Sequence, residues 1–420
     1  KMAVNDNGEA TVVAVLTLKK HAEGIWITKL LLELEKIASP PYEFQIVALE
    51  SIDASFFGAD SMPTSWRAIV NRVSDAANPI QVKACQAVLT AATIWGLPVY
   101  NGPRCYSIGC NKFLHHQIFY RAGMQTPRSV MVRFFVEGKD GVENKDVTIV
   151  DKLLSASTLL ENRGCQWPFL IKPNSAGFGS GIALLYNQEE LTRYGRRVLS
   201  DNAFAPSNDG LALLQEYIQP KDSSIFRVWF LDGNVQCATK RSVDSETTAD
   251  TISHAFTKGC ASSVGASCQL SNQLDSSKNV KSQTSLSQNF TKGCLSGSEC
   301  SLKKTSQPSD EACRNGEIES VSRARFTAWK IPLDVKNEIE NLLLHVGSEC
   351  QAGSVEFLYN SFGERLYFDL NMLSTLPTTN DGSVENAGVW PDEYNPWVEL
   401  AESIERFILG GHSGNTLDAC

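Results

Sequence analysis

The sequence predicts an α/β chain of more than one domain, in which a parallel sheet comes first and α+β units follow. The chain has 420 residues, which is more than one ordinary hydrophobic core accommodates. Hydrophobic residues make up 42% of the chain, enough to form packed cores over most of its length. Strand-like and helix-like segments alternate near the start, and this order is typical of a parallel sheet covered by helices.

The first hundred residues contain six expected elements. Short apolar runs predict strands, and longer segments with apolar residues three or four positions apart predict helices. In chain order we expect a strand at 11–18, a helix at 25–37, strands at 44–49 and 66–70, a helix at 80–95 and a short strand at 97–100. The sequence Asn-Gly-Pro at 101–103 then interrupts the pattern, so we end the first domain at residue 102.

Two further units are expected, at 103–214 and at 215–420. The first combines helices at 110–122, 150–161 and 189–199 with strands at 130–135, 169–172, 182–186 and 211–215. The second begins with a hairpin of 226–231 and 235–240, followed by a helix at 335–346, a hairpin of 354–359 and 365–370, and a helix at 398–407.

Residues 242–322 differ in composition from the rest of the chain. Ser, Thr, Lys and Asn dominate, so this segment buries too little apolar area to offset its chain entropy, and we expect a disordered insertion. The sequence FTKGC occurs at 256–260 and again at 290–294, and a further cysteine, Cys268 or Cys300, follows each copy. A zinc site is the alternative to a local duplication, but these cysteine spacings are longer than those usual in zinc sites.

Charge and cysteine usage exclude several classes of protein. The formal net charge of −9 argues against general nucleic-acid binding, because a negative protein repels phosphate backbones. No apolar stretch approaches the length of a membrane span, so we expect no membrane partner. None of the 12 cysteines forms a C-x-x-C pair, and most stand singly in apolar patterns, so a reducing cytoplasm is the expected location.

The stretch with the most chemical information follows the predicted strand at 169–172. This strand ends in a lysine and leads into a loop of small residues: Lys172, Ser175, Gly177, Gly179, Ser180 and Gly181. Glycines allow the backbone to approach a phosphate, successive N–H groups bind anions, and the lysine adds a positive charge. In a P-loop the lysine follows the glycines, and a dinucleotide fingerprint leads into a helix, so this loop is neither. A plain turn is the alternative.

Two other features agree with phosphate binding. Lys112 opens a predicted helix, from which it would reach a second phosphate. The strand at 211–215 ends in polar residues that suit contact with the edge of a flat base.

Glu356, Asp369 and Asn371 lie on the two strands of the second predicted hairpin. Alternation along a strand places Asp369 and Asn371 on the same face. Two carboxylates and an amide oxygen are hard ligands that suit Mg²⁺ held together with phosphate. A solvated hairpin face is the alternative, but the neighbouring residues are apolar, and buried acids need a partner such as a metal.

Taken in order, these features resemble the ATP-grasp superfamily, and within it the RimK-like carboxylate–amine (glutamate) ligases. The resemblance covers nearly the whole chain except the insertion and the last few residues. The motifs that carry it lie at 71–74 (NRVS), 101–103 (NGP), 111–112 (NK), 122–127 (AGMQTP), 171–173 (IKP), 215–218 (QEYI), 226–228 (FRV) and 369–371 (DLN).

The resemblance implies a fold and a set of roles. A pre-ATP-grasp α/β domain would precede two α+β subdomains that clamp ATP. Lys112 and Lys172 would hold the ATP phosphates under a lid loop at 177–181. The adenine-binding segment would be Gln215, Glu216, Tyr217 and Ile218, and Arg227 and Arg241 would stabilise the phosphate or acyl phosphate. Two Mg²⁺ ions, or Mn²⁺, would be held by Glu356, Asp369 and Asn371.

The sequence departs from the family pattern at two places. The family usually has Asp before Glu in the metal triad, whereas here Glu356 precedes Asp369. Ile225 occupies a position where the family often carries an acid that contacts the nucleotide, and Asp222 is a candidate substitute.

The expected function is that of an ATP-dependent ligase. It would join a small-molecule or peptide carboxylate to an amine through an acyl phosphate, with release of ADP and phosphate, and a homo-oligomer is compatible with this activity. Two alternatives remain: a kinase on the same fold, in which a hydroxyl accepts the phosphoryl group, and a nucleotide-binding regulatory protein without turnover.

Overall fold

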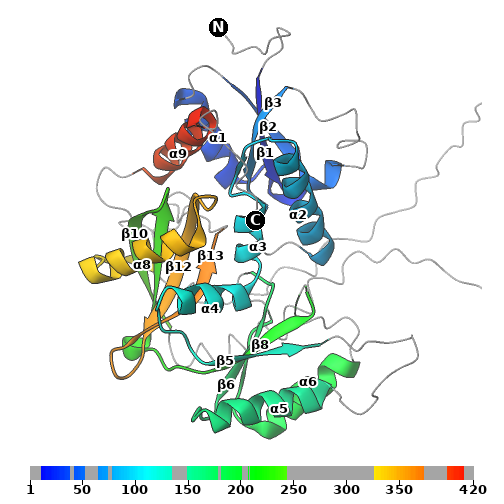
Figure 1. Cartoon of the computed structure of the whole chain (residues 1–420), viewed down its shortest axis with the longest axis vertical. Helices are drawn as coiled ribbons and strands as arrows, with labels where there is room; N and C mark the ends of the chain where they lie inside the picture. The colour runs from blue at the N-terminus through cyan, green and yellow to red at the C-terminus, as the bar shows by residue number, and fades with distance from the viewer. Residues whose placement is uncertain are drawn as a thin grey trace, which may run out of the picture. The chain divides into compact units, whose positions relative to one another are not determined.

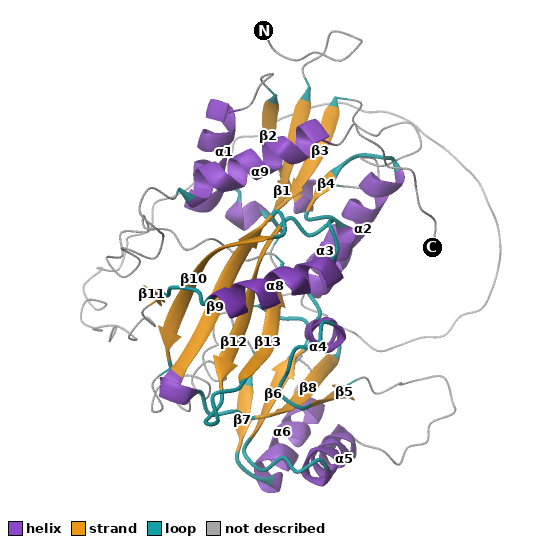
Figure 2. Ribbon diagram, turned by 60° about the vertical axis from the view of Figure 1, so that its left-hand side comes forward, coloured by secondary structure: helices purple, strands orange, loops and turns teal. Residues whose placement is uncertain are grey.

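The computed structural model describes residues 11–37, 42–52, 65–73, 78–134, 149–177, 181–200, 207, 209–243, 326–372 and 395–410. The described residues form one parallel and two antiparallel sheets with helices packed on them (Figures 1 and 2). The expected α/β and α+β character is therefore confirmed. Most of the predicted insertion, including both copies of FTKGC, lies outside the described residues.

The first sheet is parallel and has the strand order β2-β1-β3-β4. Its strands are β1 (Val12–Thr17), β2 (Glu43–Ala48), β3 (Trp66–Asn71) and β4 (Val99–Tyr100). The helices α1 (Ile25–Ile37) and α2 (Pro79–Ile94) belong to the two hydrophobic clusters on its two faces. Alternate residues of β1 enter the two clusters, which explains why this strand is apolar throughout.

The last helix of the described chain, α9 (Pro396–Gly410), packs on this first sheet. It lies beside α1, and Figures 1 and 2 show the two helices together. Trp397 of α9 meets Trp26 of α1 edge to face, with ring centroids 5.1 Å apart. Trp397 therefore belongs to a hydrophobic core.

The second sheet is antiparallel and has the order β5-β8-β6-β7. Its strands are β5 (Ser129–Arg133), β6 (Phe169–Pro173), β7 (Ala183–Leu185) and β8 (Leu211–Glu216). The helices α5 (Ile149–Asn162) and α6 (Gln188–Ser200) pack on one face, side by side in Figure 1. Because Ile171 and Leu214 point into that core, their neighbours Lys172 and Gln215 point to the opposite face.

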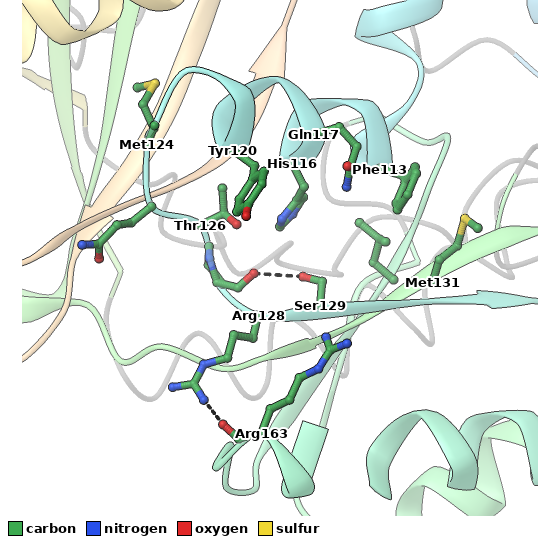
Figure 3. Close-up of a pocket in the computed structure, with 14 residues that line it drawn as sticks. Phe113, His116, Gln117, Tyr120, Met124, Thr126, Arg128, Ser129, Met131 and Arg163 are labelled. Atoms are coloured by element: carbon green, nitrogen blue, oxygen red, sulfur yellow. Dashed lines mark hydrogen bonds between the residues drawn. The ribbon is translucent and has the colours of Figure 1, made fainter. Parts of the chain in front are cut away.

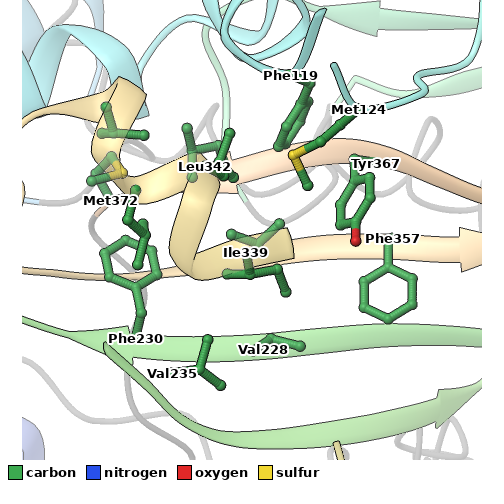
Figure 4. Close-up of a cluster of buried hydrophobic side chains, with 14 of the residues drawn as sticks. Phe119, Met124, Val228, Phe230, Val235, Ile339, Leu342, Phe357, Tyr367 and Met372 are labelled. Atoms are coloured by element: carbon green, nitrogen blue, oxygen red, sulfur yellow. The ribbon is translucent and has the colours of Figure 1, made fainter. Parts of the chain in front are cut away.

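The third sheet is antiparallel and has the order β11-β10-β9-β12-β13. Its strands are β9 (Ser224–Leu231), β10 (Asn234–Ser242), β11 (Phe326–Ala328), β12 (Ala352–Tyr359) and β13 (Arg365–Asn371). The helices α3 (Pro103–Gly109), α4 (Lys112–Arg121) and α8 (Leu333–Val346) contribute to its core. Figure 4 shows Phe230, Ile339, Phe357 and Tyr367 in this core.

Asn101 joins the first sheet to the third. It follows β4 in a left-handed conformation with a φ of 53° and is fully buried. Its side-chain amide donates to the carbonyl oxygens of Ala352 (3.2 Å) and Met372 (3.0 Å). Its side-chain oxygen accepts from the backbone N–H groups of Gln351 and Ala352, each at 3.1 Å. One buried side chain thus fixes the ends of three strands.

Four features were not predicted correctly. The helix expected at 110–122 begins at Lys112, because Asn111 caps it by accepting from the N–H of Leu114. A separate helix, α3, precedes it. The expected strand at 97–100 covers only Val99–Tyr100, and β11 was not predicted, because both are too short to show a period.

No helix in the described part of the chain combines the length and the apolar character needed to cross a membrane. The cysteines expected in cores are found there. Among the described residues, buried free thiols occur at Cys85, Cys105, Cys110, Cys165, Cys237 and Cys350.

Candidate nucleotide and metal site

A row of charged residues crosses three neighbouring strands of the third sheet. Arg227 of β9 lies opposite Glu356 of β12, and Glu356 lies opposite Asp369 of β13. The Arg227 guanidinium forms an ion pair with the Glu356 carboxylate. Asn371 lies two residues beyond Asp369 and pairs with Ser354. Cross-strand partners share a face, so the structure brings the three predicted metal ligands together on one side of the sheet.

A β-bulge at Phe368 directs Asp369 to this side. Phe357 pairs with Tyr367, and Glu356 pairs with Asp369, so Phe368 is the extra residue on β13. Tyr367 points into the core. In a regular strand of the same sequence, Asp369 would share the face of Tyr367, which lies two residues earlier. The bulge therefore places an acid opposite the apolar core.

His115 of α4 holds Asp369. Its Nδ1 lies 3.0 Å from Oδ1 of Asp369, and its Nε2 lies 2.7 Å from the carbonyl oxygen of Ile108. Burial alone raises the pKa of Asp369, but the hydrogen bond from His115 and the charges of Lys112 and Arg227 outweigh it, so the pKa lies below its usual range. His115 was not among the predicted site residues, although it lies three residues after Lys112 on the same helical face.

The two predicted phosphate-binding lysines lie within electrostatic reach of Asp369. Lys172 is buried, and its Nζ lies 5.0 Å from the centroid of the Phe368 ring. Burial lowers the pKa of Lys172 to about 8, Asp369 acts in the opposite direction, and Lys112 adds to the lowering. Lys112 Nζ donates to the carbonyl oxygen of Ala176 at 2.7 Å. The site therefore places two cations beside a carboxylate that lies about 200 positions from Lys172 in the sequence.

The start of the predicted phosphate loop is fixed by Asn174. Its carbonyl oxygen accepts from the N–H of Lys112 (3.1 Å), and its side-chain oxygen accepts from the N–H of Phe113 (2.8 Å). These contacts use the first N–H groups of α4. The hydroxyl of Ser175 is buried and has no hydrogen-bond partner among the described residues. An anion acceptor would satisfy this donor.

The glycine loop is described only at its two ends. Gly177 is the last described residue before the gap, and Gly181, which has a φ of 73°, is the first after it. Gly179 and Ser180 lie outside the described residues.

In the predicted adenine-binding segment, the side chains of Gln215 and Glu216 form hydrogen bonds with other residues of the protein. The Gln215 amide nitrogen lies 3.2 Å from Nε2 of His116 and donates to the Ser129 hydroxyl at 3.0 Å. The Glu216 carboxylate accepts from the Arg128 N–H at 2.6 Å. Gln215 is fully buried and therefore cannot turn its side chain toward a base without breaking these bonds.

The rest of that segment, Tyr217 and Ile218, has no regular secondary structure. The Tyr217 hydroxyl donates to the side-chain oxygen of Gln219 at 2.8 Å. Ile218 follows it as an apolar residue that could contact the face of a base.

Arg241 lies near the end of β10. Its strand partners are Ile225 and Phe326, and Thr239, two residues earlier, lies opposite Arg227. Alternation places Arg241 on the same face of the sheet as Arg227 and Glu356. Burial lowers the pKa of Arg241, and the group remains a cation at neutral pH.

The donor set fits a hard divalent ion brought in with phosphate. Within the described ranges, no three His, Cys, Asp or Glu side chains form a cluster able to bind a metal alone. Glu356, Asp369 and Asn371 supply two carboxylates and one amide, and phosphate oxygens would complete such a coordination sphere. The buried Ser175 hydroxyl and the two lysines provide matching groups for the phosphates.

Solved structures share this architecture. A RimK-domain ATP-grasp protein from Sphaerobacter thermophilus aligns with a TM-score of 0.52 and 12% identity, over 94% of this chain and 100% of the other. A D-alanine–D-alanine ligase from Bacillus anthracis, complexed with ATP, aligns with a TM-score of 0.52 and 12% identity, over 96% and 98%. A D-cycloserine synthetase, DcsG, aligns with a TM-score of 0.54 and 11% identity, over 94% and 99%.

No family model matches the sequence, and no curated protein matches it. The structural matches are ATP-grasp ligases, and they cover nearly the whole of both chains. The fold of this chain is therefore the ATP-grasp fold, as the sequence motifs predicted.

Proposed function

We propose that this protein is an ATP-dependent carboxylate–amine ligase that forms an amide through an acyl phosphate. The observation that carries the proposal is the meeting of Lys112, Lys172 and Asp369. These residues come from three segments far apart in the sequence. Asp369 and Lys112 both act on the pKa of Lys172, and Lys112 also lowers the pKa of Asp369. Phosphoryl transfer needs cations that bind the phosphates and carboxylates that bind a divalent ion, and this site combines the two.

The proposed reaction has two steps. A carboxylate oxygen of the acid substrate attacks the γ-phosphorus of ATP, and ADP leaves. The amine then attacks the acyl carbon, phosphate leaves, and the amine loses a proton. Both steps need positive charge at positions where negative charge develops. Chemistry of this kind needs no activated side-chain nucleophile.

Different residues of the chain would have different roles in these two steps. Lys112 and Lys172 would bind the ATP phosphates, and the Ser175 hydroxyl would donate to one of them. Arg227 and Arg241 would stabilise the phosphoryl group and the tetrahedral species formed by the amine. Glu356, Asp369 and Asn371 would hold Mg²⁺, which supplies Lewis-acid stabilisation of the phosphate oxygens when it is bound. The glycine loop at 177–181 would exclude water from the acyl phosphate.

The structural neighbours support the cofactors and the substrate classes. The Bacillus anthracis ligase was solved with ATP, and the ligase PsnB was solved with Mg, ADP and a variant of its minimal precursor. PsnB aligns here with a TM-score of 0.52 and 13% identity, over 95% of this chain and 99% of the other. We propose ATP and Mg²⁺ as cofactors, with a small-molecule or peptide carboxylate and an amine as substrates.

Trapping with hydroxylamine tests the proposal. The protein is incubated with Mg-ATP, hydroxylamine and a panel of amino acids and short peptides, and ADP and hydroxamate are both measured. A ligase yields hydroxamate and ADP in equal amounts, because hydroxylamine captures the acyl phosphate. Lys172→Met should abolish both products, whereas Lys20→Met, at an exposed lysine, should not.

Other results would replace the proposal. ADP formation with a stable phosphorylated product and no hydroxamate would indicate a kinase. Protection from thermal unfolding by Mg-ATP without any product would indicate a regulatory protein.

A further inference from the structure

A cavity of about 570 Å³ lies beside α4, between this helix, the loop that follows it and strands β5 and β8 (Figure 3). Its volume is in the range of small-molecule sites. None of the residues that we assign to phosphate or metal binding lines it. The cavity is therefore distinct from the proposed phosphate and metal site, although two of its lining residues, His116 and Ser129, bond Gln215 of the predicted adenine-binding segment.

The charged groups of the cavity are all cationic. Arg128 and Arg163 line it, and none of its lining residues is Asp or Glu. The Arg128 guanidinium lies 3.5 Å from the Glu216 carboxylate, so part of its charge is already offset. Within the described ranges Arg163 forms no ion pair, and its side chain is exposed. Figure 3 shows both guanidinium groups at the same side of the cavity. This arrangement favours an anionic ligand.

His116 adds a neutral donor. Its side chain is buried and lines the cavity. Burial lowers the pKa of His116 to about 3, with smaller contributions from the charges of Lys172 and His115, so the ring is neutral at physiological pH. The Gln215 amide nitrogen can only donate, so Nε2 of His116 accepts and the ring proton is on Nδ1. This N–H has no partner among the described residues and is available to an oxygen acceptor.

The remaining walls are largely apolar. Phe113 of α4, Met131 of β5 and Leu213 of β8 line the cavity, and Tyr120 lies at its edge with most of its side chain exposed. Phosphate alone would leave these side chains in contact with water. A ligand with an apolar body would bury these side chains. The cavity therefore favours a ligand that combines a negative charge with an apolar body.

We propose that this cavity binds a small organic carboxylate with an aromatic or branched apolar body. The carboxylate would lie against Arg163 and Arg128 and accept from Nδ1 of His116. The apolar body would contact Phe113, Met131 and Leu213. The site lies outside the proposed nucleotide site, and its occupation does not depend on ATP.

Calorimetric titration of the full chain without nucleotide tests this inference. The probe is 3-phenylpropionate, and 3-phenylpropionamide, propionate and inorganic phosphate serve as matched ligands. We expect saturable binding of 3-phenylpropionate, and binding weaker by about tenfold or more for the three matched ligands, because each lacks the charge or the apolar body.

Two variants locate the site. Arg163→Met removes the exposed cation, and Met131→Glu places a negative charge in the cavity at an exposed position on β5. Both should weaken binding of 3-phenylpropionate by about tenfold or more. Arg121→Met, at an exposed arginine of α4 outside the cavity, should not. Circular dichroism and thermal unfolding check that each variant is folded.

Three results would overturn the proposal. The first is the absence of saturable binding by the wild-type protein. The second is equal binding of the acid and its amide, or of the wild type and folded Arg163→Met. The third is displacement of 3-phenylpropionate by Mg-ATP, which would place the probe in the nucleotide site instead.

Discussion

Several charged groups of the candidate site act on Asp369. About a quarter of its side chain is exposed, and the hydrogen bond from His115 together with the charges of Lys112 and Arg227 keeps its pKa below the usual range despite burial. The carboxylate is therefore ionised at every physiological pH. It can bind a cation without first losing a proton.

Asp369→Asn tests this charge. The substitution keeps the shape of the side chain and removes one negative charge, so formation of hydroxamate should fall by at least about a hundredfold while the fold persists. Hydroxamate assays over a range of Mg²⁺ concentrations measure the change, and circular dichroism measures the fold. Glu189→Gln, at an exposed acid of α6, is the control and should retain full activity. Normal turnover of Asp369→Asn at ordinary Mg²⁺ would refute the metal assignment.

His115→Gln tests the positioning of that carboxylate. Without the imidazole, Asp369 loses its hydrogen bond and its fixed orientation, so metal affinity should fall by about ten- to a hundredfold. Paramagnetic resonance of bound Mn²⁺ in the presence of ATP measures this affinity directly. A purely structural role would lower the melting temperature and leave the Mn²⁺ affinity unchanged, and that result would remove His115 from the site.

The lowered pKa of Lys172 predicts that nucleotide binding depends on pH. Its pKa of about 8 in the free protein should rise when the negative phosphates of ATP bind beside it. Binding near pH 8 should therefore take up about half a proton, and binding well below pH 8 should take up almost none. Calorimetry in buffers of different ionisation enthalpy measures the uptake. Lys172→Met should abolish it, and an unchanged uptake in that variant would assign the proton to another group.

The lowered pKa of Lys172 also makes the stability of the free protein depend on pH. Between pH 8 and the ordinary lysine pKa of 10.5, the unfolded chain binds the proton more tightly than the folded one does. The contribution of Lys172 to the free energy of unfolding therefore rises with pH across this window.

At the residue scale, sequence patterns predicted the residues that have a recognisable chemistry. Lys172 ends an apolar strand, and Glu356 and Asp369 stand in apolar strands, so all three positions indicated function. His115 could not be predicted, because its role depends on the docking of α4 against β13, more than 200 residues away. The inward orientation of Gln215 depends in the same way on His116 and Ser129.

At the scale of elements, the third sheet depends on a glycine beside the site. A Cβ at Gly353 would lie 2.6 Å from Cζ of Phe230 and 2.8 Å from the carbonyl oxygen of Asn371. The Phe230 ring is buried, and the carbonyl belongs to the backbone of β13. Neither neighbour can move away easily.

Gly353→Ala should therefore lower the free energy of unfolding by about 1–3 kcal/mol. It should also displace Asn371 and reduce metal affinity. Denaturation in urea measures the first effect, and Mn²⁺ binding measures the second. Gly410→Ala, where an added Cβ would meet no atom within 4 Å, should change stability by about 0.5 kcal/mol or less. Equal stability of the two variants would contradict the packing argument.

Long periodic elements were predicted to within a few residues. The expected helix at 25–37 coincides with α1, and β9 and β10 form the hairpin expected from 226–231 and 235–240. The bulge at Phe368 was not predictable, because its apolar side chain fits either face of the strand. Local patterns thus specify the elements, while contacts between strands decide which face Asp369 occupies.

At the scale of the whole molecule, the long insertion starts and ends at neighbouring strands. Arg241 of β10 pairs with Phe326 of β11, so the residues on either side of 244–325 meet in one antiparallel ladder. Replacement of 245–319 by a short Gly/Ser linker should close this hairpin without strain. The melting temperature should change by about 5 °C or less, and stabilisation by Mg-ATP should persist. Thermal unfolding with and without Mg-ATP measures both, and an insoluble variant would show that the insertion contributes to folding.

The domain limits placed at 102 and 214 remain predictions. Contacts made by Asn101 and by α9 connect parts of the chain that are distant in the sequence. No local pattern reports such contacts. The order of elements was therefore predictable from the sequence, whereas the return of the chain to its first sheet was not.

The packing of α9 on the first sheet affects how the chain folds during synthesis. Val13, Val15 and Val70 of the first sheet are buried in the same cluster as Leu400, Ile404 and Ile408 of α9. A ribosome adds about 5–20 residues per second, so the roughly 330 residues between β3 and α9 take from about 15 s to about a minute. During that time α9 is absent from this face, and the nascent chain presents to chaperones the apolar surface that α9 later buries. The first sheet is translated first, but the hydrophobic cluster on this face is completed only when α9 packs on it.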